Sequence, residues 1–585
     1  MLRTLRYISK RDWVLVIISV ALIVVQVWLE LLLPDYMSDI TLLVETEGSE
    51  MSEILSAGGK MMLCALGSLV SCCIVSVLSS QIASNYGASL RGALFQKVQT
   101  FSMAEIGKFS TASLITRSTN DVTQVMMLIV MGLQMLVKAP IMAVWAIVKI
   151  AGKATEWTLT TAAAVVILLI VVGVIIAVCI PKFKKIQVLT DDLNRITREN
   201  LTGLRVVRAY NAEGYQESKF EEANKKVTDA NLFTVRATSF LLPTITLTMN
   251  MLSLAVYWIG AILIDEAELM DRAEIFSDMV VFSQYAVQVV MSFMMLVMIF
   301  MMVPRASVSG SRIMEVLDTE CSIQDGAGAS PDPEKAGTVE FRDVSFRYAD
   351  EEGDALEHIT FTAHPGETVA FIGATGCGKS TVINLVPRFY DATEGEVLVD
   401  GVNVKEYTQK DLRNRIGYVS QSATLFKGTI SSNITFGDNG KDEPTQEDVD
   451  HAIEVAQASE FVNKLDDKSE SFVASRGTNY SGGQKQRISI ARAICRDPEI
   501  LIFDDSFSAL DYKTDKELRK ALSKDCAGTT KLIVAQRIGT IRDADQIVVL
   551  DQGKVAGIGK HDELMKTCPV YQKIALSQLS KEELA

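Results

Sequence analysis

Histidine is scarce in this 585-residue chain, and no Cys pair has the C-x-x-C spacing. The four His residues offer few candidates for a His-based metal centre or catalytic triad. Three of the nine Cys lie in one apolar run, so the sequence supports neither a disulfide framework nor a zinc site. The formal net charge is −14 without a Lys/Arg-rich block, which argues against nucleic acid as the main partner.

Apolar and charged residues are segregated along the chain. Hydrophobic residues make up 48% and charged residues 22% of the sequence, and 21 of the 23 Met lie before residue 310 together with nearly all long apolar runs. The chain is about four times the roughly 150-residue length of a typical domain. We therefore expect an α-helical membrane domain followed by a soluble domain.

Six apolar segments have the length of about 20 residues that a bilayer crossing needs. They cover residues 13–33, 58–82, 125–148, 157–180, 240–264 and 277–303. The third contains Gln134 and Lys138, so we expect it to face partner helices or a water-filled cavity rather than lipid. The first is too long for a signal peptide and continues to Pro34, so we expect it in the mature protein.

Charge in the connecting segments predicts the orientation. Basic residues precede the first span, and segments 85–123 and 181–239 are rich in Lys and Arg. Loop 34–56 has no Lys or Arg, and loop 265–276 is predominantly acidic. The positive-inside rule then places the N-terminus, both long connections and the C-terminal half in the cytoplasm, with the spans in the cytoplasmic membrane.

The two long cytoplasmic connections are mostly free of Pro and are predicted to form helical stalks. At about 1.5 Å per residue, a descending and a returning helix would reach roughly 25 to 40 Å beyond the bilayer. A Gly/Pro-rich stretch at 325–333 is typical of a linker. We assign residues 1–311 to the transmembrane domain, 312–337 to the linker and 338–585 to the soluble domain.

The soluble half shows the pattern of a parallel α/β sheet. Short apolar strands alternate with helical stretches. The expected strands are 369–371, 396–399, 500–503, 531–534 and 546–550.

A phosphate-binding loop follows the first of these strands. The sequence Gly-Ala-Thr-Gly-Cys-Gly-Lys-Ser-Thr matches G-x-x-x-x-G-K-[ST]. Its backbone N–H groups can surround phosphate oxygens, Lys379 can bridge the β and γ phosphates, and Ser380 can hold Mg²⁺. Asp504 ends a strand, where a carboxylate can bind Mg²⁺ through water. The candidate ATP-binding residues of the loop are Gly373, Thr375, Gly376, Cys377, Gly378, Lys379, Ser380 and Thr381.

Further motifs around this loop resemble those of the ATP-binding cassette (ABC) family. They are Tyr348, Gln421, the sequence Tyr480-Ser-Gly-Gly-Gln484, and Ser508-Ala-Leu-Asp511. With six preceding spans, the whole chain resembles a half-transporter of the ABC exporter type, with a P-loop NTPase domain at residues 338–585.

The resemblance implies a role for each of these residues. Tyr348 would stack on adenine, Gln421 would contact Mg²⁺ and sense it, and Asp511 would lie at a dimer interface. Ser481, Gly482, Gly483 and Gln484 would cap ATP bound to a second subunit, since a Ser-Gly-Gly turn that opens a helix offers N–H groups to an anion.

Two positions of the ATP site depart from the family's pattern. Hydrolytic members have Glu after the Mg²⁺-binding Asp, but this chain has Asp505, whose carboxylate sits one methylene shorter. The usual histidine that contacts the γ-phosphate is replaced by Gln536, which cannot carry a proton. Ser475 also replaces a common Glu. Weaker general-base assistance, typically worth about 10²- to 10⁴-fold, follows from the first change.

These departures lead to the hypothesis of a heterodimer. This chain would hold MgATP and hydrolyse it poorly, while its signature loop completes the catalytic site of a second half-transporter. A slow homodimer, exporting lipid or peptide, and an ATP-gated channel or regulatory subunit remain alternatives. Methionines in the third and sixth spans give adaptable apolar surface, so a drug-like or lipophilic cargo is favoured over a lipid or peptide cargo.

Overall fold

The computed structural model describes residues 2–45, 49–150, 155–268, 271–349 and 353–578. The chain divides into two compact units. The first, the membrane unit, contains residues 1–99 and 111–319; the second, the nucleotide-binding unit, contains residues 100–110 and 320–585.

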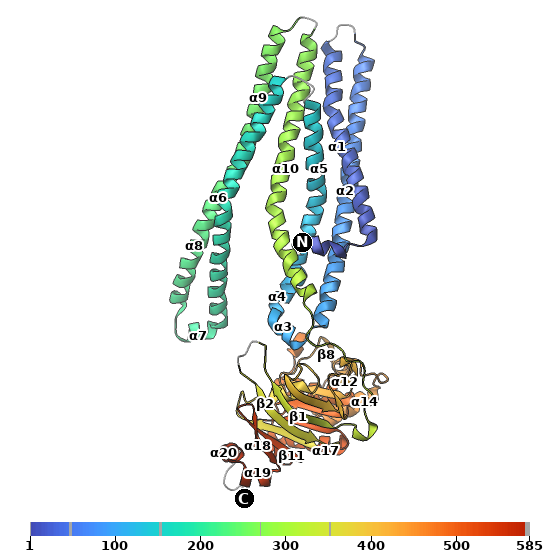
Figure 1. The fold of residues 1–585 in the computed structure, drawn as a ribbon, viewed down its shortest axis with the longest axis vertical. Helices are drawn as coiled ribbons and strands as arrows, with labels where there is room; N and C mark the ends of the chain where they lie inside the picture. The colour runs from blue at the N-terminus through green and yellow to red at the C-terminus, as the bar shows by residue number, and fades with distance from the viewer. Residues whose placement is uncertain (1, 46–48, 151–154, 269–270, 350–352, 579–585) are drawn as a thin grey trace. The chain divides into compact units, whose positions relative to one another are not determined.

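Long helices build the membrane unit (Figure 1). Their bounds are α1 Lys10–Glu45, α2 Met51–Gln99, α4 Thr111–Thr116, α5 Val122–Ile150, α6 Thr155–Thr202, α7 Leu204–Ala209, α8 Glu213–Ser239, α9 Leu241–Glu266 and α10 Arg272–Asp318. A 3₁₀ helix, Leu2–Tyr7, precedes them, and a π-helical turn, Arg117–Asp121, joins α4 to α5. Among the described residues, six helical stretches are long and apolar enough to cross a membrane, which confirms the predicted spans.

The long cytoplasmic connections are helical, as predicted. Helix α2 continues to Gln99, and α6 runs to Thr202 before the short α7 leads into α8. Figure 1 shows α6 and α8 side by side. Helix α10 continues to Asp318, so residues 312–318 form its last turns. The side chains of Ile313, Met314 and Val316 in these turns are buried.

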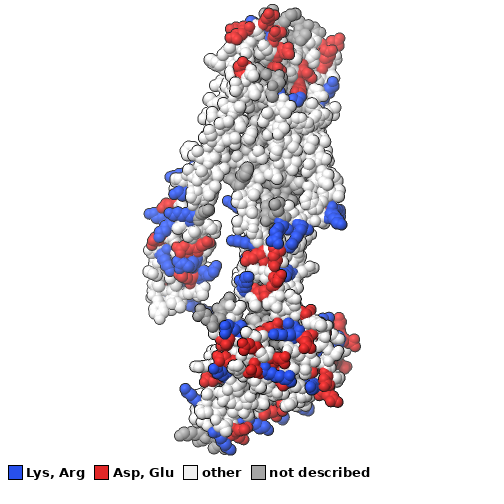
Figure 2. Space-filling model, in the orientation of Figure 1, with Lys and Arg blue, Asp and Glu red and all other residues white. Residues whose placement is uncertain are grey.

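Charge on the membrane unit follows the predicted orientation. Figure 2 shows acidic side chains gathered at one end of the membrane unit, and basic together with acidic side chains on α6 and α8. A broad band without charge separates them. A band of this kind matches the hydrocarbon layer of a bilayer.

Buried aromatic residues hold the membrane helices together. The Trp157 ring lies 5.3 Å from that of Phe282, and Trp157 Nε1 donates a 3.1 Å hydrogen bond to the carbonyl of Val256. The hydroxyl of Tyr285 donates to the carbonyl of Leu31 at 2.8 Å. These contacts join α6, α9, α10 and α1.

The described residues of the nucleotide-binding unit form three sheets. Their orders are β12-β11-β3-β10-β9-β6, β2-β1-β4-β5 and β7-β8. The strands are β1 Val339–Phe346, β2 Leu356–Ala363, β3 Thr368–Gly373, β4 Glu394–Val399, β5 Val402–Asn403, β6 Ile416–Val419, β7 Gly428–Thr429, β8 Phe472–Val473, β9 Ile500–Asp504, β10 Thr530–Val534, β11 Gln546–Asp551 and β12 Lys554–Gly559.

The helices of this unit begin with α3, Met103–Phe109, which lies far from the others in sequence. The rest are α11 Lys379–Leu385, α12 Gln409–Asn414, α13 Ile430–Ile434, α14 Gln446–Val455, α15 Ser459–Val462, α16 Gly482–Cys495, α17 Tyr512–Asp525, α18 Ile538–Ile541, α19 His561–Thr567 and α20 Pro569–Gln578. Short 3₁₀ turns cover Pro333–Lys335, Lys468–Glu470 and Ser475–Gly477.

One predicted strand belongs to a different sheet. Strands β3, β9, β10 and β11 pair in parallel as expected, but residues 396–399 lie in β4, which pairs antiparallel with β1 and β5. The reason is the turn at Asp400-Gly401, where both residues have positive φ. An Asp-Gly pair of this kind makes a tight hairpin instead of the helical crossover that parallel pairing requires.

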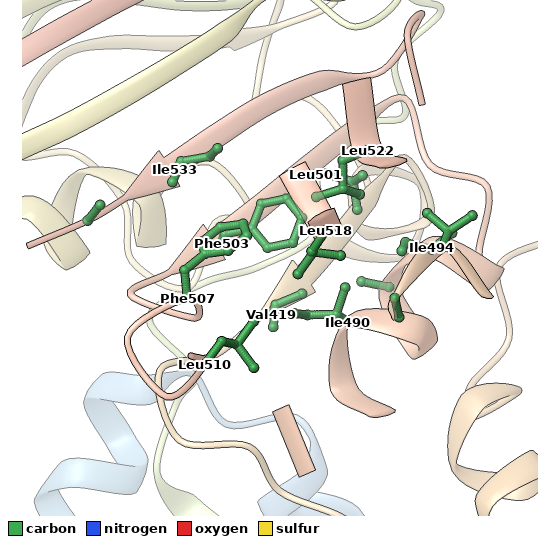
Figure 3. Packing of buried hydrophobic residues seen from close by; sticks show 14 of the residues in the cluster. Val419, Ile490, Ile494, Leu501, Phe503, Phe507, Leu510, Leu518, Leu522 and Ile533 are labelled. Carbon is green, nitrogen blue, oxygen red and sulfur yellow. The ribbon is translucent and has the colours of Figure 1, made fainter. Parts of the chain in front are cut away.

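Both faces of the parallel sheet are buried. In β9, Leu501 and Phe503 point into a core shared with α16 and α17, whereas Ile500 and Ile502 point into the core against β1 and β2. Figure 3 shows the first core, where Phe503 and Phe507 lie near Leu518. Since side chains alternate along a strand, this double burial fixes the register and holds the strand ends in place.

The glycine-rich segment after α10 packs on the nucleotide-binding unit. The N–H of Gly326 donates to the carbonyl of Tyr407 at 2.9 Å, and that of Gly328 donates to the carbonyl of Glu406 at 3.1 Å. A Cβ at position 326 would contact the Glu406 backbone, so this close approach requires Gly. The segment is therefore anchored rather than loosely tethered.

Candidate nucleotide-binding site

The carboxyl ends of four parallel strands meet at one edge of the sheet. Val534 in β10 pairs with Asp504 in β9, and Val419 in β6 pairs with Phe503. The P-loop follows β3 at the same edge, because Phe371 is also opposite Val534. Ligands of open parallel sheets bind at this edge, so the strand register gathers the predicted site residues.

The P-loop has the backbone conformation that its glycines predict. Gly376 and Gly378 have φ of 84° and 96°. A Cβ on Gly378 would lie 2.6 Å from Leu356 Cδ2 and 2.9 Å from the carbonyl of Ala355, so only Gly fits there. The Lys379 ammonium donates to the carbonyls of Gly373 and Ala374 at 2.9 and 2.8 Å. It therefore lies across the loop that would surround the phosphates.

The residues that would hold Mg²⁺ come together. Ser380 Oγ donates a 2.7 Å hydrogen bond to Asp504 Oδ1, which joins α11 to the end of β9. Burial raises the pKa of Asp504. Among the described residues no cluster of three or more His, Cys, Asp or Glu could hold a metal. One carboxylate and one hydroxyl are nevertheless enough protein ligands for Mg²⁺, because this ion keeps several of its waters and also binds the phosphates of the nucleotide.

Asp505 is held by two amides. Its Oδ2 accepts hydrogen bonds from Gln536 Nε2 at 2.7 Å and from Gln421 Nε2 at 3.4 Å. Asp505 has φ of 47°, an uncommon conformation for a residue with a side chain. Burial raises its pKa, partly offset by the Gln421, Ser508 and Gln536 hydrogen bonds.

Tyr348 lies beside the P-loop helix. Its hydroxyl is 3.0 Å from Thr381 Oγ1, and its ring makes edge contacts with Phe346 and Tyr390 at 4.8 and 5.4 Å. The ring position is therefore fixed by aromatic packing at one edge and by α11 at the hydroxyl.

A cavity of about 560 Å³ joins these groups. It is lined by Tyr348, Asp354, Ala355, Thr375, Gly376, Gly378, Lys379, Ser380, Thr381, Gln421, Asp505, Val534, Gln536, Gln552 and Gly553. Sequence reasoning missed Asp354, Ala355, Val534, Gln552 and Gly553. Gly553 in the sequence predicts a turn here, and Gln552 and Gly553 have φ of 47° and 80°. The position of this turn opposite the P-loop depends on the pairing of β11 with β3, which the sequence does not show.

Three predicted residues lie behind the cavity instead of lining it. Gly373 ends β3 and has no room for a side chain against the carbonyl of Leu550. Cys377 is buried, with its sulfur 3.7 Å from the Lys379 ammonium. Asp504 reaches the site through Ser380.

The structure does not bring the signature residues to this cavity. Ser481 is the exposed N-cap of α16 and exchanges hydrogen bonds with Gln484 in a capping box. Gly482 and Gly483 form the first turn of that helix, and Asp511 caps α17 through the N–H of Thr514. Within this chain these residues cap or begin helices.

Helix α3 joins the nucleotide-binding unit, and sequence reasoning missed it. The buried Glu105 carboxylate accepts hydrogen bonds from the N–H of Ser102 at 2.8 Å and from the N–H of Ser322 at 3.1 Å. The hydroxyls of Ser102 and Ser322 are 3.0 Å apart. The available signal was the Ser-x-x-Glu spacing of a capping box at 102–105.

Two family models match the chain. The ABC transporter model matches residues 356–508, and the ABC transporter transmembrane region model matches residues 14–302. An uncharacterized ABC transporter ATP-binding protein of Mycobacterium tuberculosis is 37% identical over 90% of this chain and 88% of its own length. This chain belongs to the ABC transporter family.

Other relatives of this ABC transporter have more specific names. The ATP-dependent lipid A-core flippase of Pseudomonas aeruginosa is 32% identical over 84% of this chain and 80% of its own length. The structure of a bacterial Atm1-family ABC exporter with ATP bound aligns with a TM-score of 0.80 at 24% identity, covering 98% of this chain and 99% of that one. The predicted fold class is confirmed: a six-helix membrane domain precedes an ABC ATP-binding domain.

Proposed function

We propose that this ABC transporter is one subunit of a heterodimeric exporter that moves drug-like or lipophilic cargo out across the cytoplasmic membrane. Its own Walker motifs bind MgATP at a degenerate, weakly hydrolytic site. Its signature loop completes the catalytic site of a second half-transporter.

The hydrogen bond between Gln536 and Asp505 carries this proposal. The groups needed to bind MgATP are together, because Lys379 lies along the P-loop and Ser380 contacts Asp504. In contrast, the carboxylate in the general-base position is short and accepts a 2.7 Å hydrogen bond from an amide that cannot exchange a proton with it. A general base must reach its water within about 2.6 to 3.2 Å. Binding without efficient hydrolysis follows.

The exposed signature loop supports a role in a second subunit's site. Ser481 and Gly482 are exposed, and a Cβ on Gly482 would meet nothing within 4 Å. The first turn of the 14-residue α16 therefore offers N–H groups to an external anion. A triphosphate bound to another subunit is an anion of this kind.

Exposed methionines support a lipophilic cargo. Met127 and Met131 of α5, and Met291 and Met298 of α10, are each more than a third exposed. Thioether side chains adapt to ligands of varied shape. The name of the Pseudomonas relative, a lipid A-core flippase, refers to a lipophilic cargo as well.

The test compares the isolated chain with its co-expressed partner complex. ATP turnover should be slow for the chain alone and restored in the complex, and trapped-nucleotide analysis should find γ-phosphate loss mainly in the partner's pocket. Robust turnover by the isolated chain, or equal cleavage in both pockets, would contradict the proposal. Inverted vesicles should accumulate a fluorescent lipophilic dye when ATP is added, and this accumulation should require the partner's catalytic Glu. If no ATP-dependent accumulation occurs, a gated channel is favoured.

A further inference from the structure

An ion pair lies within the membrane unit, apart from the nucleotide-binding site. Lys138 of α5 donates a 2.8 Å hydrogen bond to Oε1 of Glu30 in α1. The same oxygen accepts from Gln26 Nε2 at 2.9 Å and from Ser68 Oγ of α2 at 3.1 Å. Three membrane helices thus direct donors at one carboxylate oxygen.

The pair lies toward the outer end of the apolar spans. Glu30 is 17 residues beyond Trp13, at the start of the first predicted span, and at about 1.5 Å per residue this is roughly 25 Å into a core of about 30 Å. Lys138 is 13 residues into the third span, or roughly 20 Å by the same measure. With the N-terminus in the cytoplasm, both groups lie in the outer half of the membrane.

The hydrogen bonding of the pair is incomplete. Within the described residues, Glu30 Oε2 has no hydrogen-bond partner, and the Lys138 ammonium has no second acceptor. The two side chains are 20% and 19% exposed, so both can be reached from outside the helix packing. Ionisable groups in a membrane span must be satisfied, and the remaining acceptor and donors require polar groups that the described part of the chain does not provide.

We propose that Glu30 and Lys138 bind the zwitterionic headgroup of an amphiphilic cargo. The cargo's ammonium would donate to Glu30 Oε2, and its phosphate or carboxylate would accept from the free N–H groups of Lys138. The pair is neutral overall, so a singly charged headgroup would leave a net charge in a low-dielectric environment, whereas a zwitterion leaves none. A headgroup site in the outer half is suited to a late step of export.

This inference rests on the proposed export of lipophilic cargo, but its test measures binding and needs no hydrolysis. The probes are phosphatidylethanolamine, phosphatidylglycerol and a cationic diacyl ammonium lipid, each with the same nitrobenzoxadiazole-labelled acyl chain. Trp28, which is half exposed and two residues from Glu30, is a nearby energy-transfer donor. The full-length chain in nanodiscs should bind the zwitterionic probe at least 10-fold more tightly than the others.

The decisive variant is Glu30→Gln with Lys138→Met. Replacing a buried ion pair by neutral groups is often neutral or stabilising, so this chain should fold with an unchanged melting temperature. Its headgroup preference should fall to within about 2-fold. The matched control, Asp35→Asn with Lys149→Met, removes another ion pair between α1 and α5 and should leave the preference intact.

Each other outcome overturns the proposal. A wild-type chain without headgroup preference, an unchanged preference in the Glu30/Lys138 variant, or an equal loss in the control would mean that the pair only joins helices. If the variant does not fold, phosphatidylethanolamine carrying a headgroup diazirine decides the question on the wild-type chain. Its crosslinks should fall within one helical turn of Glu30 or Lys138, and crosslinks elsewhere contradict the site. Failure of the ATPase asymmetry alone would leave these binding results unaffected.

Discussion

Gln536 donates a 2.7 Å hydrogen bond to the carboxylate of Asp505 at the carboxyl edge of the central sheet. The two departures from the family's pattern, Asp505 and Gln536, are therefore in direct contact at Asp505 Oδ2. An amide nitrogen is a donor only, so it keeps this oxygen occupied and cannot relay a proton. The two substitutions are best understood as a pair.

Restoring both residues should increase hydrolysis at this site. We expect Asp505→Glu with Gln536→His to raise ATP turnover by at least roughly 10²-fold, because the longer carboxylate reaches the water position and general-base assistance is worth about 10² to 10⁴. The measurement uses the proposed heterodimer with the catalytic Glu of the second half-transporter changed to Gln, so that the other site is silent.

The control for this experiment is Asp505→Asn with Gln536→His, which supplies the histidine without a base. It should remain as slow as the wild-type site. Equal rates for the Glu and Asn versions would show that some other feature, such as a badly placed signature loop, limits hydrolysis here.

Substitutions of Ser481 distinguish its role as a helix cap from its proposed contact with ATP bound to a second subunit. Asp is as good an N-cap as Ser, so Ser481→Asp should leave the melting temperature unchanged, whereas Ser481→Ala should cost about 1 kcal/mol. A carboxylate at this position would repel a bound γ-phosphate. In the Ser481→Asp variant, ATP hydrolysis by the proposed heterodimer should therefore fall at least about 10-fold, while ATP binding to this chain persists. Unchanged hydrolysis would mean that the loop lies away from the nucleotide of the second subunit.

The local motifs of the ATP site could be predicted, but its walls could not. The P-loop and Asp504 follow from a short pattern and from a strand end, and Gln421 follows from the resemblance to the ABC family. Gln552 and Gly553 line the same cavity only because β11 lies next to β3, a non-local pairing.

The same distinction holds outside the site. The Lys138 charge was visible in its span, but its partner Glu30 lies 108 residues away. Strand β4 was assigned to the wrong sheet because its apolar pattern does not distinguish antiparallel from parallel pairing; the Asp400-Gly401 turn does.

Tyr348 should contribute to adenine binding only. We expect Tyr348→Ala to weaken ATP binding by about 5- to 150-fold, since base stacking on an aromatic ring is worth about 1 to 3 kcal/mol. Tyr348→Phe keeps the ring and loses only the hydroxyl contact with Thr381, so its effect should be small. Affinity for inorganic tripolyphosphate, measured by competition, should be the same in all three proteins; parallel losses for both ligands would indicate a damaged P-loop instead.

Glu105 should hold α3 to the segment that follows α10. Burial alone would raise the pKa of Glu105, but hydrogen bonds from Ser102 and Ser322 outweigh it and hold the pKa below its ordinary value. Glu105→Gln replaces one of the two accepting oxygens with an NH₂ group, so one backbone N–H faces a donor and the other keeps only an uncharged acceptor. Hydrogen bonds to charged groups are worth about 1.5 to 3 kcal/mol, so exchange of the Ser322 amide should accelerate roughly 10- to 150-fold.

The pH dependence of this effect distinguishes an ionised carboxylate from simple packing. Because the folded pKa is depressed, the stabilisation by Glu105 is fully present above the ordinary Glu pKa of about 4.3 and is lost as pH falls through the lower folded value. The difference between wild type and Glu105→Gln should therefore be constant above about pH 5 and shrink below about pH 4. Asp448→Asn, which alters the equivalent capping box of α14, should leave Ser322 exchange unchanged at every pH. A difference that stays constant as pH falls below the ordinary Glu pKa, down to the acid unfolding of the wild type, would mean that side-chain shape, not charge, joins the two segments.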